Sequence, residues 1–484
     1  MTRVLLTFLL VLFFALPLFA QSVDTAWVRR YNGQGNSYDA AKAIVVDNRS
    51  NVYVTGSSGT IKYSSDGELL WIGSFGGVAI AVDSASNVYV TEGSNDDYVT
   101  VKYYPNGDTA WLRTYNGPGN GTDDAYAIAT DSSGNVYVTG LSMGSGTSSD
   151  YATVKYYPNG DTAWVRRYDG PVNGWDKASA IAVDGSGNVY VTGSSDEEYE
   201  ELIREHYATI KYYPNGDTAW VRRSWFSWRG DKANDLTVDN SGNVYVTGTS
   251  SLNMRNSVYA SIKYDVNGDG LWGRIYGWCD CEAYNEAYAI AADNSGNAYV
   301  TGMSTSSGGG ATIKYYSNGD TAWVRRDSNG TAIDIVVDVF GNAYVTGSSY
   351  SGGTSCDFAT IKYYTNGDSA WVRRYNGPES LSDYGNAIAI DGSDNVYVTG
   401  ESYGSGTGMD YVTIKYVQFL RGDANNDEKV TVSDVVYLIN YLFKGGPTPN
   451  PLQSGDANCD GQVTVSDVVY LINYLFKGGP PPAC

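Results

Sequence analysis

Short segments of alternating apolar and polar residues recur along most of the chain. Each unit has four of them: an AIAVD-like run, an NVYVT-like run, an IKY-like run and a tryptophan run such as TAWVRRY. Their length, their Val, Ile, Tyr and Trp content, and the Gly, Asn and Asp between them predict β-strands, here termed A to D. The NVYVT-like run begins eight times, at Asn51, Asn87, Asn135, Asn188, Asn243, Asn297, Asn342 and Asn395.

Four strands repeated eight times predict an all-β fold, an eight-bladed β-propeller. Residues 24–31, DTAWVRRY, are a D strand with no A, B or C strand before them. The last unit has an A strand (385–391), a B strand (395–400) and a C strand (411–416), but no D strand. We therefore expect the N-terminal strand to complete blade 8, which closes the ring and leaves no exposed sheet edge.

At the C-terminus the period of two gives way to a helical pattern. Residues 422–446 and 455–479 are near copies of one segment, and each ends in an apolar stripe of helical spacing followed by two glycines. Before each helix, oxygen-bearing residues have the spacing of a calcium loop, in which position 7 gives its backbone carbonyl. The predicted ligands are Asp423, Asn425, Asp427, Lys429, Thr431 and Asp434 in loop 1, and Asp456, Asn458, Asp460, Gln462, Thr464 and Asp467 in loop 2.

The duplicated loop and helix over residues 421–484 resemble a type I dockerin. This resemblance implies two bound Ca²⁺ ions and docking onto a cohesin-type partner, with Val432, Ser433, Val465 and Ser466 at the partner-choosing positions. Loop position 6 needs a left-handed backbone, which Gly461 adopts easily and Glu428 resists, so we expect loop 2 to bind calcium more tightly. The repeats over residues 21–420 resemble the SBBP-type β-propeller repeat, a family with little functional definition.

The N-terminus predicts export. Arg3, an apolar run over residues 4–14 and a small residue at Ala20 have the pattern of a signal peptide, here residues 1–20. The run is too short to span a bilayer, so we expect a secreted protein, extracellular or associated with the cell surface. Cys459 and Cys484 are candidates for a disulfide within the dockerin. The pairing of Cys279, Cys281 and Cys356 stays open, with a bond from one of the first two to Cys356 as one option.

Most repeated residues have a structural interpretation. The Asp before each A–B turn, as in DSSGN, is typical of a hairpin cap, and the D-strand tryptophans are typical of packing between blades. A further set of acids precedes the A strands, and for these we favour a capping role over a cation site. This set is Asp39, Asp123, Asp176, Asp231 and Asp383.

The B–C and D–A loops vary in length and share one face, where binding residues are expected. The four tryptophans outside D strands all fall in D–A loops at the junctions of blades 3/4, 4/5 and 5/6, and a charged stretch lies nearby at residues 196–206, interpreted as a solvated acidic loop. These aromatics either bind sugar rings or basic peptides, or cover their own loops. The ligand candidates are Trp175, Trp225, Phe226, Trp228 and Trp278.

Charge and composition narrow the function. A net charge of −21 disfavours nucleic acid and anionic membranes as partners. With one histidine and no nucleophile motif, we favour a secreted non-catalytic protein whose propeller binds a glycan or protein while the dockerin tethers it. The first alternative is a polysaccharide-degrading hydrolase or lyase of a cellulosome-like system, in which two carboxylates suffice for glycosidic cleavage. The second alternative is a cell-surface structural protein.

Overall fold

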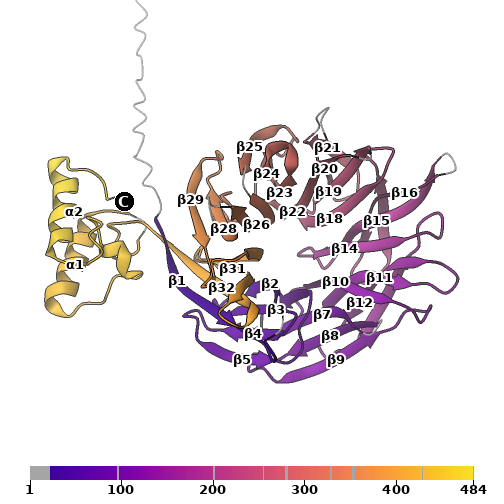
Figure 1. The fold of residues 1–484 in the computed structure, drawn as a ribbon, viewed down its shortest axis with the longest axis horizontal. Helices are drawn as coiled ribbons and strands as arrows, with labels where there is room; N and C mark the ends of the chain where they lie inside the picture. Colours follow the sequence, from indigo (N-terminus) through magenta and orange to yellow (C-terminus); the bar gives the residue numbers. More distant parts are fainter. Residues whose placement is uncertain are drawn as a thin grey trace, which may run out of the picture. The chain divides into compact units, whose positions relative to one another are not determined.

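A computed structural model describes residues 22–36, 38–94, 97–199, 202–253, 255–277, 282–327, 330–350, 355–427 and 429–482. It contains two compact units: a propeller over residues 25–416, and a second unit that holds the C-terminal residues from Val417 onward. The propeller consists of eight four-stranded sheets placed around a central opening (Figure 1). Neighbouring strands within a blade are antiparallel, as the short turns between them require.

Blades 1 to 4 follow the chain in the order A, B, C, D. Blade 1 has the fewest strand residues in total, as expected, and the B–C hairpin of blade 4 has the longest pair in this half. The strands are β2 (Ala41–Val46), β3 (Val52–Gly56), β4 (Gly59–Tyr63) and β5 (Leu69–Gly73); β6 (Ala79–Val82), β7 (Val88–Ser94), β8 (Asp97–Tyr103) and β9 (Thr109–Tyr115); β10 (Asp123–Thr130), β11 (Val136–Met143), β12 (Ser149–Tyr156) and β13 (Thr162–Tyr168); β14 (Asp176–Val183), β15 (Val189–Tyr199), β16 (Leu202–Tyr212) and β17 (Thr218–Ser224).

Blades 5 to 8 continue the pattern, and β1 (Ser22–Tyr31) pairs with the last strand to give the sheet order β1-β32-β31-β30. The prediction that the N-terminal strand closes the ring is therefore confirmed. The other strands are β18 (Asp231–Val238), β19 (Val244–Asn253), β20 (Asn256–Tyr264) and β21 (Gly270–Tyr276); β22 (Asn285–Ala292), β23 (Ala298–Ser304), β24 (Gly309–Tyr315) and β25 (Thr321–Asp327); β26 (Gly330–Val337), β27 (Ala343–Tyr350), β28 (Cys356–Tyr363) and β29 (Ser369–Tyr375); β30 (Asp383–Ile390), β31 (Val396–Gly404) and β32 (Gly408–Phe419).

The A–B and C–D turns share one face of the propeller, which we call the turn face. In blade 3 the Asp131 carboxylate accepts hydrogen bonds from the N–H groups of Ser133 and Asn135, from the Asn135 amide and from the Tyr137 hydroxyl, at 2.7–2.9 Å. Burial disfavours the charged form, but these donors hold the pKa of Asp131 below its ordinary value. The same cap recurs at Asp47, Asp83, Asp184, Asp239, Asp293, Asp338 and Asp391, which confirms the turn role.

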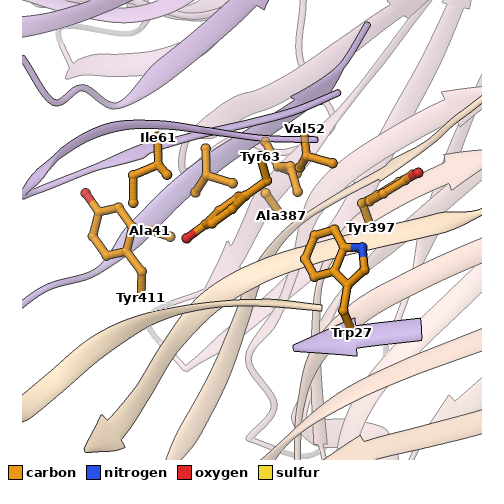
Figure 2. Packing of buried hydrophobic residues seen from close by; sticks show 10 residues of the cluster. Trp27, Ala41, Val52, Ile61, Tyr63, Ala387, Tyr397 and Tyr411 are labelled. Atoms are coloured by element: carbon orange, nitrogen blue, oxygen red, sulfur yellow. The ribbon is translucent and has the colours of Figure 1, made fainter. Parts of the chain in front are cut away.

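The D-strand tryptophans join neighbouring blades, as predicted. Trp27 packs between Tyr397 of its own blade and Tyr63 of blade 1, with ring centroids 6.2 and 6.0 Å away (Figure 2). Its indole N–H and the Lys415 ammonium both donate to the Ser65 carbonyl in the next C–D turn, at 3.1 and 3.0 Å. The corresponding Trp and Lys converge in the same way on the carbonyls of Pro105, Pro158, Pro214, Val266, Ser317 and Thr365.

The C-terminal unit contains two equal helices, α1 (Val432–Lys444) and α2 (Val465–Lys477). Thr431 and Thr464 begin them as capping boxes with Asp434 and Asp467, and a left-handed glycine ends each. Buried leucines of both helices form one small core. Within the described residues, no helix is long and apolar enough to cross a membrane. Two short 3₁₀ helices, η1 (Thr305–Ser307) and η2 (Leu452–Gly455), complete the structure.

Candidate functional site

The B–C and D–A loops form the opposite face of the propeller, which we call the loop face. Here the acids that precede the A strands cap the D–A loops: Asp123 accepts from the Gly117 N–H at 2.6 Å, and Asp383 from the Gly377 N–H at 2.7 Å. The equivalent acids Asp39, Asp176 and Asp231 do the same, and all five are fully buried. These hydrogen bonds agree with the predicted capping role.

The charged stretch 196–206 is not a loop but part of a protruding hairpin. β15 and β16 pair from Val189↔Tyr212 as far as Tyr199↔Leu202, and the hairpin extends past those of the neighbouring blades (Figure 1). Glu197 lies opposite Arg204, whereas Asp196 lies opposite Glu205, so the strand pairing and not a match of charges defines this stretch. The interpretation of this stretch as an acidic loop was therefore wrong.

Two exposed tryptophans flank this hairpin. The backbone of Trp175 is fixed to Asp196, whose carboxylate accepts from the Trp175 N–H at 2.7 Å and whose own N–H donates back to the Trp175 carbonyl at 3.1 Å. On the other side, the Trp225 ring lies 6.0 Å from the ring of His206, the only histidine of the chain. Trp175 is 63% exposed and Trp225 is 61% exposed, so neither covers its own loop.

A third tryptophan, Trp228, is 67% exposed on the same D–A loop as Trp225. This loop is anchored at both ends: the Ser227 hydroxyl donates to the Ser251 carbonyl at 2.8 Å, and the Ser251 N–H donates to the Gly230 carbonyl at 2.9 Å. The backbone that carries Trp228 is therefore tied to strand β19. Trp278 lies outside the described residues.

Phe226 has a different position from the tryptophans. Its ring packs edge-on against the buried Tyr207 with centroids 5.6 Å apart. In blade 3 the D-strand residue Tyr168 makes this contact with Tyr151, and blade 4 has Ser224 in place of that tyrosine. Phe226 thus supplies a missing core ring and is not part of the exposed surface.

A polar groove of about 440 Å³ opens on the loop face between blades 5 and 6. The Lys232 ammonium at its edge pairs with the Glu205 carboxylate of β16 at 3.1 Å, which places the groove beside the hairpin and Trp225. Burial, together with the charge of Glu286, raises the pKa of Tyr288 in the groove to about 12. The lining residues are Lys232, Asn234, Thr249, Ser251, Asn253, Asn256, Ser257, Tyr284, Glu286 and Tyr288.

The two predicted calcium loops fold alike but are not equivalent. In loop 1 the carboxylates of Asp423, Asp427 and Asp434 place oxygens within 4.8 Å of one another, a spacing that fits one cation. In loop 2 the Asp456 carboxylate instead pairs with the Arg421 guanidinium at 3.2 Å. A cation in loop 2 must therefore compete with Arg421. Glu428, on which the expected difference between the loops rests, lies outside the described residues, so that difference stays a prediction.

The residues at the predicted partner positions, Val432 and Ser433 in α1 and Val465 and Ser466 in α2, are exposed at the helix starts. Cys459 is disulfide-bonded, and its predicted partner Cys484 lies outside the described residues, as do Cys279 and Cys281. Cys356 is buried and free, so the option of a bond to Cys356 is not realised.

Two protein families match the chain. The dockerin type I domain matches residues 421–476, and the SBBP beta-propeller repeat matches residues 111–146, 173–200, 220–253 and 370–406. The chain carries SBBP-type β-propeller repeats and, at residues 421–476, a type I dockerin domain. Type I dockerins bind calcium and dock onto cohesins in cellulosome-type assemblies, and proteins that carry them are typically extracellular.

Solved structures that resemble the chain have low sequence identity to it. The Dos1 propeller has 8% identity and a TM-score of 0.51, and the match covers 80% of this chain and 95% of that one. The WD40 propeller domain of Doa1 has 10% identity and a TM-score of 0.42 over 74% and 99%, and the polysaccharide lyase Uly1 has 9% and 0.44 over 81% and 98%. These similarities concern the fold alone. No curated protein matches the chain.

Sequence reasoning found the tryptophans because they break the repeat. It missed the groove, because its asparagines and tyrosines occupy repeat positions that vary in every blade. Only the packing of β18, β19 and β20 of blade 5 against β22 of blade 6 brings the groove residues together.

Proposed function

We propose that this is a secreted, non-catalytic binding protein whose propeller holds a glycan on the loop face of blades 4 to 6. Its dockerin attaches the propeller, in a calcium-dependent way, to a cohesin-type partner. The observation that carries the proposal is the polar groove between blades 5 and 6 beside the exposed Trp225 and Trp228. Tethering through the dockerin would add avidity when the assembly and the propeller contact the same polysaccharide.

The chemistry of this surface suits sugar rings. Indole planes stack on the apolar faces of pyranoses, and the exposed tryptophans offer such planes on anchored backbone. Asparagine amides both donate and accept hydrogen bonds, as sugar hydroxyls do, and three of them line the groove: Asn234, Asn253 and Asn256. Ligand pockets with a few fixed polar groups beside aromatic surface are the usual form of small-molecule and oligosaccharide sites.

Charge favours a neutral glycan over a basic peptide. The groove carries one basic residue, Lys232, and one acidic residue, Glu286, and its other lining residues are uncharged. The Lys232 ammonium is already paired with Glu205. A cationic peptide would find one negative charge in the groove, that of Glu286, whereas hydroxyl groups would find many partners.

Affinity electrophoresis of the full chain in gels that contain neutral polysaccharides tests the proposal. We expect retardation by at least one β-glucan, xylan or mannan, and loss of that retardation in the Trp225→Ala, Trp228→Ala double variant. Phe340→Ala is the control, because Phe340 is equally exposed (67%) but belongs to an A–B turn of the turn face. Retardation unchanged in the double variant contradicts the site.

The same polysaccharides, incubated with the full chain, distinguish binding from degradation. We expect no new reducing ends and no absorbance from unsaturated products. New reducing ends would favour the hydrolase alternative, and absorbance from unsaturated products would favour the lyase alternative. The Glu286→Gln variant would then show whether the groove performs the reaction.

A further inference from the structure

A cluster of acids lies at the loop-face junction of blades 3 and 4. It joins Asp150 of β12, Asp169 of the D–A loop and Asp176 of β14, and one carboxylate oxygen from each lies within 4.8 Å of the others. Asp150 and Asp176 are almost fully buried, at 4% and 0% exposure. Bringing three carboxylates together out of water is costly unless a cation offsets their repulsion.

Each of the three carboxylates leaves one buried oxygen without a hydrogen bond. These atoms are the Oδ1 atoms of Asp150, Asp169 and Asp176, and they have no partner within the part of the chain that the structure describes. The other oxygen of Asp176 caps the loop through the Gly170 N–H, and Oδ2 of Asp150 binds the Arg167 guanidinium at 2.7 Å. The unused oxygens are therefore those available to a ligand.

A buried hydroxyl outside the acid cluster also offers an oxygen to a ligand. Ser195 of β15 pairs with Asp176 across the blade 4 sheet and is 1% exposed, and its Oγ lies beside the Asp176 carboxylate without a well-formed hydrogen bond to it. A side chain at Gly170 would come within 2.6 Å of both Ser195 Oγ and Asp176 Oδ1, so the two atoms face one small space that only a glycine leaves open. This fourth oxygen comes from an independent strand and lies beside Asp176 Oδ1.

Ser195 lacks its usual partner for a reason visible in the repeat. At the junction of blades 2 and 3, the equivalent Ser142 accepts from Arg167 at 2.5 Å. In blade 4 the equivalent arginine, Arg223, donates instead to the Tyr168 hydroxyl at 2.8 Å. The arginine that would fill the space is thus turned away from it.

Three other junctions have an amide where this one has an acid. The residue after the last D-strand tyrosine is Asp169 here but Asn116, Asn32 and Asn376 at the junctions 2/3, 8/1 and 7/8. Asn32 and Asp410 at junction 8/1 also leave oxygens without partners, so unsatisfied atoms alone do not distinguish the site. The added charge does: after Arg167 offsets one carboxylate, two negative charges remain.

We propose that Asp150, Asp169, Asp176 and Ser195 form a calcium site in the propeller, separate from the two dockerin loops. Oxygen-only ligands and a residual charge of two suit a hard divalent cation, and oxygens within 4.8 Å of one another fit Ca–O distances of about 2.4 Å. The ion would fix the D–A loop whose last residue before Asp176 is Trp175.

The test counts calcium bound by the full chain at equilibrium dialysis, in a background where Asp423→Ala and Asp456→Ala silence the dockerin loops. We expect one Ca²⁺ per chain in this background and none after Asp169→Asn is added. That substitution installs the residue found at three other junctions, so a folding defect is not expected. Asp161→Asn, which removes an exposed charge from a C–D turn of the same blade, should leave the count at one.

A second readout is the thermal unfolding of the propeller. Calcium, compared with an equal concentration of magnesium, should raise the unfolding midpoint of the dockerin-silenced chain by several degrees and have no effect in its Asp169→Asn variant. No bound calcium in the silenced background, or one ion that persists after Asp169→Asn, would overturn the site. Loss of glycan retention in Trp225→Ala leaves this result untouched, because the two tests use different residues.

Discussion

On the turn face every described A–B turn has the same Asp cap, and Trp and Lys converge on one carbonyl at seven junctions, whereas on the loop face the contacts change from junction to junction. Uniform contacts of this kind hold a ring together. The variable contacts concentrate aromatics, a groove and an acid cluster over blades 3 to 6, so we expect stability and recognition to be carried by opposite faces.

The largest expected effect tests the ring closure. Trp27→Ala removes a buried indole between blades 8 and 1 and its hydrogen bond to Ser65, and should lower the free energy of unfolding by about 4 kcal/mol. Trp225→Ala on the loop face should change it by less than about 0.5 kcal/mol. Urea denaturation of both variants makes the comparison, and equal losses would show that the loop-face tryptophans are also structural.

The cap of an A–B turn should come next. Asp131→Ala leaves the Tyr137 hydroxyl and the Asn135 amide without their acceptor and should cost about 3 kcal/mol. Asp161→Ala, in the exposed C–D turn of the same blade, is the control and should cost under about 1 kcal/mol. The free energies come from the same denaturation curves. A small loss of free energy of unfolding in Asp131→Ala would mean that this A–B turn forms without its Asp cap.

The central channel between the two faces supplies a pH test. Asp235 replaces an alanine of the repeat, and its carboxylate accepts from the Ile290 N–H of the next blade at 2.8 Å. Burial, with the charge of Asp334, raises the pKa of Asp235 to about 7. The folded state therefore holds a proton that the unfolded state has lost, so stability from this group falls as pH rises from about 4 to 7.

Between pH 5 and pH 8, the free energy of unfolding of the wild type should therefore fall by up to about 3 kcal/mol relative to that of Asp235→Ala. This substitution restores the alanine found at the equivalent position of blades 4 and 6. Thermal unfolding at the two pH values measures this difference. A constant difference between the two proteins would mean that water in the channel keeps Asp235 charged throughout.

The smallest expected effect on stability comes from two equivalent asparagines, and it separates a structural role from a role in polysaccharide binding. Asn234 and Asn386 both donate to a carbonyl of the next blade, at 2.7 and 2.9 Å, but only Asn234 lines the groove. Replacing either by alanine should cost about 1 kcal/mol. Only Asn234→Ala should also weaken retention by the polysaccharide. Equal retention of the two variants argues against the groove as the binding site.

The fold could be predicted from the sequence because each strand and each A–B turn occurs eight times and the C–D turn seven times, and because DTAWVRRY has no partner except in blade 8. The dockerin loops could also be predicted, because the spacing of their calcium ligands lies within one short stretch of sequence. The groove and the cluster around Asp169 depend on residues from two blades whose distance is set by packing. Asp169 carries a carboxylate where three equivalent positions carry an amide. Only the folded structure shows that this added charge lies near Asp150 and Ser195.

Hydrogen exchange of the full chain, with and without a retained polysaccharide, tests directly whether the loop face binds the glycan. We expect slower exchange on binding at residues 224–231, 251–257 and 284–288, which carry Trp225, Trp228 and the groove. The A–B turns and the C–D turns should exchange at unchanged rates. Protection confined to the turn face, with none in these three segments, would contradict the assignment of recognition to the loop face.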